Sequence, residues 1–406
     1  MMRSLFAGVS GLRIHQTRMD VIGNNIANIN TNGFKAGRVT FQDVLSQTIQ
    51  GARAPEAGGK GGVNPMQVGL GATIGSIDTL FAQGNLQSTG KATDLAIQGD
   101  GFFVLSDGAR VYYTRDGAFD VSADGSLVHA GTGMRVQGWQ ADANGNVDTT
   151  QPLGSIVIPL GQQIAPKATT TASFAGNLNA GASAGDAWST TITVFDSLGN
   201  SHDVTVTFTK TATANTWDWA ATVSGVGTVG TGQVVFTTSG AFSSSTGGPI
   251  TWTPSGAAAL SITPDFSTIT QYAGASTVGP SGQDGYATGS LDSFNINSAG
   301  IITGVYSNGR NLTLGQIATA RFANTGGLMK AGSNLYQESP NSGVPQVGMP
   351  DSGGRGPIFT GALEMSNVDL AQEFTNMIIA QRGFQANSRI ITTADEMLQD
   401  MIALRR

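Results

Sequence analysis

The chain has 406 residues, a formal net charge of −6 and 12% charged residues, about half the share that is usual in soluble domains. It has no basic block for nucleic acid or an anionic membrane, and no cysteine for disulfides, thiolate catalysis or cysteine-based zinc sites. Its length and its 57 glycines indicate about two to four domains that are rich in turns and β-structure.

The first predicted element is a helix over residues 5–29. Its apolar side chains follow the seven-residue spacing of a coiled-coil seam, and this stripe consists of Leu5, Val9, Leu12, Met19, Ile22 and Ile26. Asn30-Thr31-Asn32-Gly33 follows, and such residues tolerate the left-handed backbone that ends a helix. The apolar stretch at the N-terminus is too short for a cleaved signal peptide, and no run of about 18 apolar residues exists. We therefore expect neither a cleaved signal nor membrane insertion.

Short strands are predicted in the middle of the chain. The turn pairs Asp100-Gly101, Asp107-Gly108, Asp116-Gly117 and Asp124-Gly125 recur every seven to nine residues and separate short apolar runs, which predicts an antiparallel meander. A similar pattern runs from Ile301 to Ile317 around Asn308-Gly309. Between them, residues 167–284 contain no Arg and no Glu, and 191–195 and 204–208 alternate as strands around the turn at 196–200. This zone predicts an inserted β-sandwich or barrel.

The last predicted element is a helix over about residues 367–404, and Ser366 followed by Asp369 is a capping pattern at its start. Its seven-residue stripe consists of Leu370, Met377, Phe384, Ile391 and Leu398, and the alternate positions are Phe374, Gln381, Ser388, Asp395 and Ile402. A stripe this narrow is typical of a coiled-coil seam. The alternative is that both terminal helices simply pack on their own domain.

The predicted elements are arranged symmetrically along the chain: a helix lies at each end, and a strand region lies inside each helix. This order predicts that the two helices pair, that the two strand regions pair, and that the domains are nested. The expected fold class is α+β multidomain, with the N- and C-terminal helices paired as a coiled-coil-like domain and nested, mainly antiparallel β domains. We expect four parts: a terminal helical assembly domain at 1–30 with 366–406, connecting segments at 31–90 with 343–365, a β domain at 91–166 with 285–342, and an inserted outer β domain at 167–284.

The sequence shows little that could support catalysis. His15, His129 and His202 are far apart along the chain, and no pattern places an acid, a base and a nucleophile together. The segment from Gly225 to Gly230 matches a dinucleotide-binding glycine pattern, but the residues after it predict a strand instead of the required helix. We therefore expect no enzyme, no metal site and no cofactor.

Three segments carry a resemblance to a known family. Residues 23–35, GNNIANINTNGFK, resemble the N-terminal signature of bacterial flagellar rod and hook proteins. Residues 381–389 and 392–396, QRGFQANSR and TTADE, are similar to the last helix of that family, and DLAIQGDGFF at 94–103 is similar to one of its strand regions. The N-terminal motif positions that match are Asn24, Asn25, Ile26, Ala27, Asn28, Thr31, Gly33 and Phe34. The inserted zone with TVFDSLGN at 193–200 is similar to the hook branch of the family, because rod proteins lack most of this zone.

The resemblance implies a structural subunit that polymerises with copies of itself. The polymer would be the hook, a flexible curved tube outside the cell that acts as a universal joint and passes torque from the rod to the filament in motility. The implied partners are the distal rod protein, the hook cap protein, the hook–filament junction protein and the flagellar type III export apparatus. We expect the two apolar stripes to carry self-assembly.

Two other functions stay open on the sequence. The chain could be a distal rod protein of the same family. It could also be an extracellular adhesin or carbohydrate-binding module, in which Trp217, Trp219 and Trp252 would stack on sugars if they were exposed and would otherwise belong to a β core.

Overall fold

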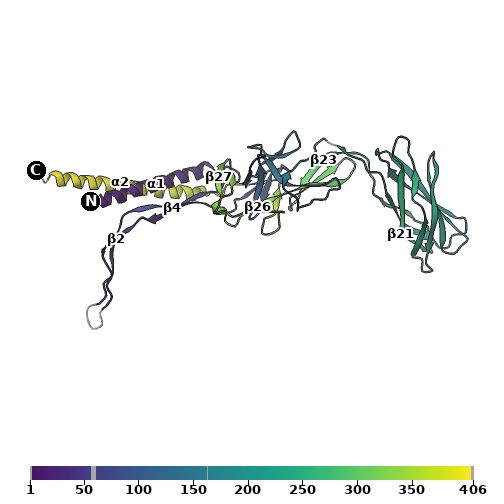
Figure 1. Cartoon of the computed structure of the whole chain (residues 1–406), viewed down its shortest axis with the longest axis horizontal. Coiled ribbons are helices and arrows are strands. Elements are labelled where there is room, and N and C mark those ends of the chain that lie inside the picture. The colour runs from purple at the N-terminus through teal and green to yellow at the C-terminus, as the bar shows by residue number, and fades with distance from the viewer. Residues whose placement is uncertain (1, 56–60, 162, 404–406) are drawn as a thin grey trace. The chain divides into compact units, whose positions relative to one another are not determined.

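A computed structural model describes residues 2–55, 61–161 and 163–403 of the chain (Figure 1). They form two compact units: unit 1 comprises 1–158, 295–303 and 313–406, and unit 2 comprises 159–294 and 304–312. Paired terminal helices and mainly antiparallel sheets confirm the expected fold class. Unit 2 contains the whole of the expected insert, 167–284. The finer division of the rest into helical, connecting and β parts stays a prediction. The expected β domain, 91–166 with 285–342, has residues 159–166, 285–294 and 304–312 in unit 2 and its remainder in unit 1.

The two long helices lie at the two ends of the described chain. They are α1, Met2–Ala27, and α2, Leu370–Ala403. The helix α2 begins about three residues later than predicted, because Asp369 caps it: Asp369 Oδ1 accepts the backbone N–H groups of Ala371 and Gln372. The Ser366 hydroxyl instead accepts the N–H of Val368, before the helix begins.

Two antiparallel ribbons follow α1, in the segment that the sequence suggested was only a connection. The ribbon next to the helices pairs β1, Gly37–Asp43, with β4, Ala72–Thr79. The chain between them folds into a second hairpin of β2, Ser46–Gln50, and β3, Met66–Gly69. Alternating polar and apolar residues pair in both ribbons, but their partners are too far apart in sequence for a turn signal to reveal them.

The β part of unit 1 begins with two short pairs that join early strands to late ones. β5, Leu86–Ser88, pairs with β31, Ala362–Glu364, and β6, Leu95–Ile97, pairs with β30, Ile358–Thr360. The main sheet then contains the predicted meander, and its strands are β7 Phe102–Ser106, β8 Val111–Thr114, β9 Phe119–Val121, β10 Leu127–His129, β11 Arg135–Gln140, β12 Gly154–Ser155, β24 Ile301–Tyr306, β25 Asn311–Ile317, β26 Thr319–Arg321, β27 Met329–Gly332, β28 Leu335–Gln337 and β29 Gln346–Gly348. A short 3-10 helix, η1, spans Thr325–Gly327. The predicted meander is confirmed only as two antiparallel hairpins, β7–β8 and β9–β10, because β8 pairs on its other side with β28 and not with β9. The late pattern at 301–317 corresponds to the neighbouring strands β24 and β25.

An aromatic cluster forms one core of unit 1. Phe102, Tyr113, Phe322 and Tyr336 are buried there, and Phe81 packs against them. The ring of Phe102 lies edge-on to Phe81, Phe322 and Tyr336, at centroid distances of 5.6 to 5.9 Å. Such contacts favour one arrangement of the strands that carry them.

Unit 2 contains two larger sheets that share a core. Five strands form a meander of β15 Ala187–Phe195, β16 Ser201–Lys210, β17 Thr216–Val223, β18 Gly227–Phe236 and β19 Phe242–Gly247. Four strands form the second sheet, in the order β20 Ile250–Trp252, β21 Leu260–Tyr272, β14 Thr171–Asn179 and β22 Gly279–Gln283. The remaining strands, β13 Gln163–Ile164 and β23 Gly289–Ile296, pair with each other, and β23 also pairs with β24, so that the sheet containing β24 and β25 has 14 strands with these two included. Trp217, Trp219 and Trp252 are buried in the core, so the aromatic residues on which the adhesin hypothesis depended are not on the surface.

Candidate functional site

The terminal helices α1 and α2 lie side by side and antiparallel, and we call them the helix pair (Figure 1). A methyl group built on Gly11 would lie 2.6 Å from Cγ of Asn387, and one built on Gly383 would lie 2.5 Å from the ring of His15. Each helix therefore presents a side chain to a glycine of the other. Because glycine has no Cβ, the backbones approach closely at these two points. The two reciprocal contacts set the register of the pair.

The buried side of the helix pair consists mostly of small residues. Gly8 and Gly11 are buried on α1, and Ala380 and Ala394 are buried on α2. The Arg18 guanidinium on α1 donates to the side-chain oxygen of Asn376 on α2 at 3.3 Å. This contact is narrow, so it leaves most of the large apolar side chains of both helices outside it.

The two predicted stripes lie beside this narrow contact. Ile22 is buried, and the half-buried members are Leu5, Leu12, Met19, Ile26, Met377, Phe384, Ile391 and Leu398. The exposed members are Val9, Leu370, Phe374 and Ile402, and the polar positions Gln16, Gln381, Ser388 and Asp395 are not buried either. The fold of one chain thus covers the stripes only in part. Their role in self-assembly stays a prediction.

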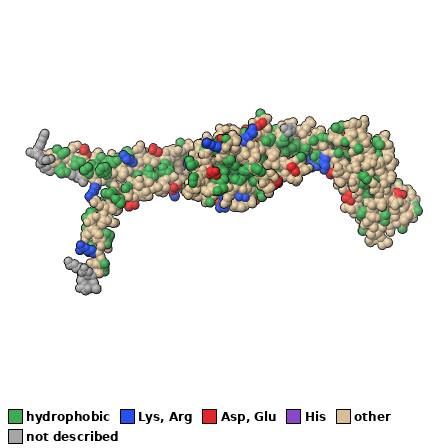
Figure 2. Space-filling view, viewed as in Figure 1, with side chains coloured by type: hydrophobic (Ala, Val, Ile, Leu, Met, Phe, Trp, Pro, Cys, Tyr) green, Lys and Arg blue, Asp and Glu red, His purple; other side chains and the backbone are tan. Residues whose placement is uncertain are grey.

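Exposed apolar side chains follow both helices (Figure 2). We call these residues the terminal apolar surface: Met2, Phe6, Val9, Leu370, Phe374, Ile378, Ile379, Ile390, Met397, Met401 and Ile402. Phe6 is 68% exposed and Ile402 is 72% exposed. Many large apolar side chains exposed on two adjacent helices indicate an interaction site. The sequence analysis missed Phe6, Ile378 and Ile379 because they fall next to the strict seven-residue positions and not on them.

A groove lies along α1 beside the start of the β ribbons. It has a volume of about 780 Å³, and its lining includes Phe6, Val9 and Ile14 from the helix and Val44 and Ile74 from the ribbon side. The hairpin β2–β3 leaves the ribbon β1–β4 close to this groove, and Figure 1 shows it extending away from the helices. Its described apolar side chains are exposed, and they are Ile49, Val63, Met66 and Val68. An isolated two-stranded hairpin is marginally stable in water, so this ribbon needs a partner surface.

Three buried charged residues join the helix pair to the β part of unit 1. We call Lys35, Arg115 and Glu364 the root cluster. Lys35 Nζ lies 2.6 Å from Glu364 Oε1, and neither side chain is exposed to solvent. Arg115 Nη1 lies 3.4 Å from Glu364 Oε2, and the Arg115 side chain is only 4% exposed. Lys35 follows α1 and Glu364 precedes α2, so the cluster holds both ends of the chain at the base of the helix pair.

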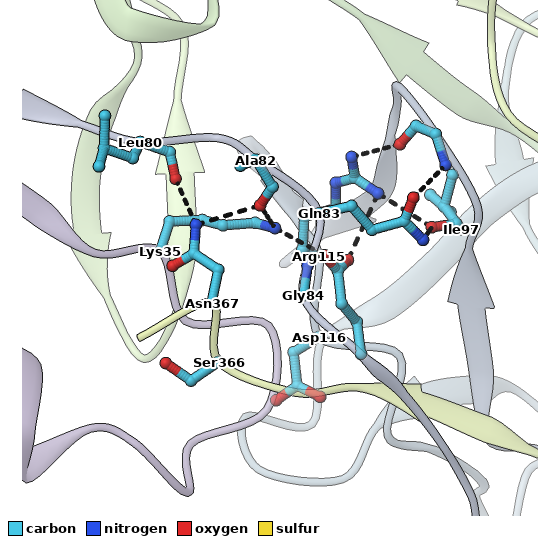
Figure 3. Close-up of polar contacts among 12 residues, drawn as sticks. Lys35, Leu80, Ala82, Gln83, Gly84, Ile97, Arg115, Asp116, Ser366 and Asn367 are labelled. Atoms are coloured by element: carbon cyan, nitrogen blue, oxygen red, sulfur yellow. Dashed lines mark hydrogen bonds and ion pairs between the residues drawn. The ribbon is translucent and has the colours of Figure 1, made fainter. Parts of the chain in front are cut away.

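Backbone groups complete the root cluster (Figure 3). Lys35 donates to the carbonyl oxygen of Ala82, and the N–H of Gly84 donates to Glu364 Oε1. Arg115 donates to the carbonyl oxygens of Ile97 and Gly99. Each contact ties a residue at the base of the helices to a strand or loop of unit 1. A buried ion pair with this many additional hydrogen bonds is strongly destabilised when one partner is removed.

The root cluster carries more positive than negative charge. Lys35 and Arg115 are two cations, and Glu364 is the one carboxylate between them. Burial lowers the pKa of Lys35 below its usual value, although Glu364 acts in the opposite direction. Burial likewise lowers the pKa of Arg115, again against the attraction of Glu364. One carboxylate therefore does not fully compensate two buried cations.

The residues of the family motif form the turn between α1 and the root cluster. Asn25 is buried, and its amide exchanges two hydrogen bonds with the backbone of Gly37, at 2.8 and 2.9 Å. Thr31 donates to the side chain of Asn28, and Lys330 lies over the ring of Phe34. Gly33 has a φ of +67°, and a methyl group there would lie 2.6 Å from the backbone nitrogen of Asp116. The motif thus ends the helix and anchors it to the β part of unit 1.

Sequence reasoning did not single out the root cluster. Lys35 appeared only as the last residue of the family motif, and Arg115 and Glu364 were not noticed. The matched residues of the motif pointed to this region. No local signal pairs residues 35 and 364, which are 329 positions apart.

The described residues contain no group of three or more His, Asp or Glu side chains that could hold a metal ion. No helix among them is long and apolar enough to cross a membrane.

Family models match four parts of the chain. The model described as flagella basal body rod protein matches residues 5–35, and flagellar basal body rod FlgEFG protein C-terminal matches 360–404. Between them, flagellar hook protein FlgE/F/G D1 domain matches 96–176, and flagellar basal body protein FlaE D2 domain matches 163–286.

Curated relatives match along the full length. The flagellar hook protein FlgE of Treponema pallidum is 44% identical, and that of Borreliella burgdorferi is 42% identical; each match covers 100% of both chains. The flagellar basal-body rod protein FlgG of Bacillus subtilis is 34% identical, also over 100% of both chains. Among solved structures, the Helicobacter pylori flagellar hook protein FlgE2 is similar with a TM-score of 0.55 and 17% identity. That likeness covers 69% of this chain and 100% of the other, and it supports the fold alone.

Proposed function

Because the chain belongs to the family of flagellar hook proteins, we propose that the terminal apolar surface and the hairpin β2–β3 are the surfaces through which its copies assemble. The chain is a structural subunit of the bacterial flagellar hook and not an enzyme. Such a subunit must bind others like it, and it can do so only through surfaces that a single folded chain leaves exposed.

The exposed apolar side chains on the helix pair carry this proposal. Phe374, Ile378 and Phe6 are each about half or more exposed in the single chain. Burying a side chain of this size contributes roughly 1.5–3 kcal/mol. Several such side chains on two adjacent helices provide enough apolar area for a stable contact with other copies. The predicted stripe residues at the edge of this surface would take part in the same contact.

The hairpin β2–β3 offers a second assembly surface. Its strands pair only with each other among the described elements, and Ile49 and Met66 are 63% and 52% exposed. A neighbouring copy that covered one face of this ribbon would supply the apolar contacts that the isolated hairpin lacks.

The surface of unit 2 suits contacts that slide. On its five-stranded sheet, the hydroxyls of Ser189 and Thr207 lie 3.0 Å apart, and those of Thr191 and Thr205 lie 3.2 Å apart, at exposed positions. Figure 2 shows few charged side chains on this unit. A net hydrogen bond is worth only about 1 kcal/mol, because water offers an alternative. We therefore infer that outer contacts rearrange at little cost as a curved tube turns, whereas the helical contacts hold. This behaviour would let the hook act as a universal joint that passes torque.

Membership of the hook family also suggests which flagellar proteins the polymer contacts and where the chain is located. We propose that the polymer joins the distal rod protein at one end and the hook–filament junction protein at the other. We propose that the chain reaches the outside of the cell through the flagellar type III export apparatus, without a cleaved signal, and adds beneath a hook cap protein.

The experiment that tests this function is to delete the gene in its host and to image purified basal bodies by electron microscopy. Complete rods without a curved extension are expected, and the wild-type gene should restore the hook. Truncated rods would assign the chain to the distal rod instead. Normal flagella would contradict the assembly role altogether.

A further inference from the structure

A small cavity opens beside the aromatic cluster of unit 1. Its volume is about 250 Å³, and its lining includes Phe81, Phe102, Phe322, Arg115, Arg321 and Asp100. Three phenylalanines form an apolar part, and two arginines with one aspartate form a polar part. The volume is below the usual range for small-molecule sites, roughly 300–1,000 Å³, so it suits one inserted side chain better than a free metabolite.

Arg115 brings the excess charge of the root cluster to this cavity. Its Nη1 and Nη2 atoms are held by Glu364 and by backbone carbonyl groups. Its Nε atom is buried and has no hydrogen-bond partner among the described residues. Arg115 as a whole is only 3% exposed. A buried guanidinium nitrogen without a partner is costly, and it leaves Arg115 with one donor that no acceptor among the described residues satisfies.

Arg321 adds a second cation at the mouth of the same cavity. Its nearest acidic partner is Asp100, at 3.9 Å between Nη2 and Oδ2, which is longer than a hydrogen bond. The Arg321 side chain is 43% exposed and that of Asp100 is 74% exposed, so water screens this contact. Arg355 lies close enough for Arg321 to lower its pKa, although burial of Arg355 is the larger cause. The region therefore has more cations than nearby carboxylates.

We propose that this cavity binds a carboxylate side chain of a second copy of the chain in the assembled polymer. Arg321 supplies planar donors that match the two oxygens of a carboxylate, and Arg115 adds the charge of its buried guanidinium and one unpaired Nε–H. The rings of Phe102 and Phe322 would cover the methylene groups of that side chain. The occupant is another copy because the chain assembles with itself, and its 27 acidic residues outnumber its 21 basic ones. The inference rests on the proposed function only in requiring assembly.

The variant Arg321→Lys makes the contact detectable in assembled hooks. It keeps the positive charge and supplies a primary amine. A water-soluble carbodiimide converts a carboxylate that touches this amine into an O-acylisourea; the amine then attacks the acyl carbon, an amide C–N bond forms and a urea leaves. We expect a crosslinked dimer that wild-type hooks lack, with residue 321 joined to an acidic residue of the other copy by peptide mass spectrometry. The matched control is Arg110→Lys, an exposed arginine outside the cavity.

The outcomes separate this inference from the assembly role. A crosslink from residue 321 that appears in the polymer and not in dilute monomer, and is absent from Arg110→Lys, supports the proposal. Hooks that assemble normally but show only a link from residue 321 to Asp100 of the same chain, or no new link, overturn it and leave the assembly role intact. A polymer of Arg321→Gln that dissociates at the same temperature as wild type, while Arg321→Lys gives no dimer, overturns it as well.

Discussion

At the scale of residues, Gly11 and Gly383 of the helix pair are required because a side chain of the other helix packs against each of them, and not because a turn needs glycine. Asn387 covers Gly11, and its Nδ2 atom donates to the carbonyl oxygen of Gly383 at 2.8 Å. The asparagine cannot move away from Gly11 without losing this bond. Apolar periodicity, the signal that predicted both helices, does not register glycine. It therefore found the helices but not the faces by which they touch.

Changing Gly11→Ala tests this contact. Alanine is the better helix former by about 1 kcal/mol, but forcing a methyl group against a fixed side chain costs about 1–3 kcal/mol. We expect a net loss of stability in urea unfolding followed by circular dichroism. Gly23→Ala is the control, because it lies on the same helix with no atom within 4 Å of the added methyl group, and it should gain stability. Adding Asn387→Ala to Gly11→Ala should recover the loss; equal behaviour of the two glycine variants would show that the contact is unimportant.

Glu364→Gln tests the root cluster. The change leaves Lys35 and Arg115 buried beside a neutral amide, and breaking a buried ion pair on one side costs about 3–5 kcal/mol. The control is Asp78→Asn, which breaks the exposed ion pair with Arg38 at 3.2 Å and should cost less than about 1 kcal/mol. Both free energies of unfolding come from urea titration of the monomer. Similar costs for the two variants would contradict a structural role for the root cluster.

At the scale of elements, the sequence predicted whether a segment is a helix or a strand better than it predicted which strands pair. Heptad spacing located both helices. Asp-Gly and Asn-Gly turns located the strands β7 to β10 and β24–β25, and alternation around the turn at 196–200 located the hairpin β15–β16. These signals are local. The pairs β1–β4, β5–β31 and β6–β30 join strands that are far apart along the chain. No short turn sequence connects them, so local signals could not predict these pairs. The start of α2 shifted because two neighbouring residues could cap it, and only the fold selects Asp369.

The turn of the hairpin β15–β16 depends on one buried carboxylate. Burial alone would raise the pKa of Asp196, but hydrogen bonds from His202, Asn200 and Leu198 hold that pKa well below its usual range. A carboxyl with a lowered folded-state pKa stabilises the fold at pH values above its unfolded pKa. It loses this contribution as the pH falls toward the folded value.

We therefore expect unit 2 to lose stability as the pH drops below about 4, the usual pKa of Asp. Asp196→Asn should be less stable than wild type at pH 7, and its stability should fall less on acidification. Tryptophan fluorescence during urea unfolding reports mainly on unit 2, because it holds Trp188, Trp217, Trp219 and Trp252. Asp203→Asn, an exposed change on the same hairpin, is the control. An unchanged pH slope in Asp196→Asn would rule out this carboxylate as the cause.

At the scale of the whole molecule, the chain combines a narrow internal contact with a wide apolar exterior. The small residues between α1 and α2 bring the helices together, while most of their large apolar side chains stay wholly or partly exposed. A single chain thus leaves unsatisfied the surface that a polymer would bury. The sequence predicted that the terminal helices mediate assembly. The predicted seam did not distinguish contacts between the two helices of one chain from contacts between copies. It could not separate internal from external positions, because both follow the same seven-residue spacing.

The most direct test of assembly through the terminal apolar surface is the polymerisation of a double variant, Phe374→Ser with Ile378→Ser. Both side chains are about half exposed, so the monomer should keep its free energy of unfolding. Losing the burial of two such side chains should weaken each subunit contact by about 3–6 kcal/mol, which is more than a hundredfold in the concentration needed to assemble. Val344→Ser, which alters an 83% exposed residue outside the helices, is the control.

The measurement is the concentration of free monomer left in solution after hooks are sedimented. The account predicts that the double variant stays in the supernatant at concentrations where wild type and Val344→Ser sediment as polymer. Sedimentation of the double variant at the wild-type concentration, with its monomer correctly folded, would contradict it.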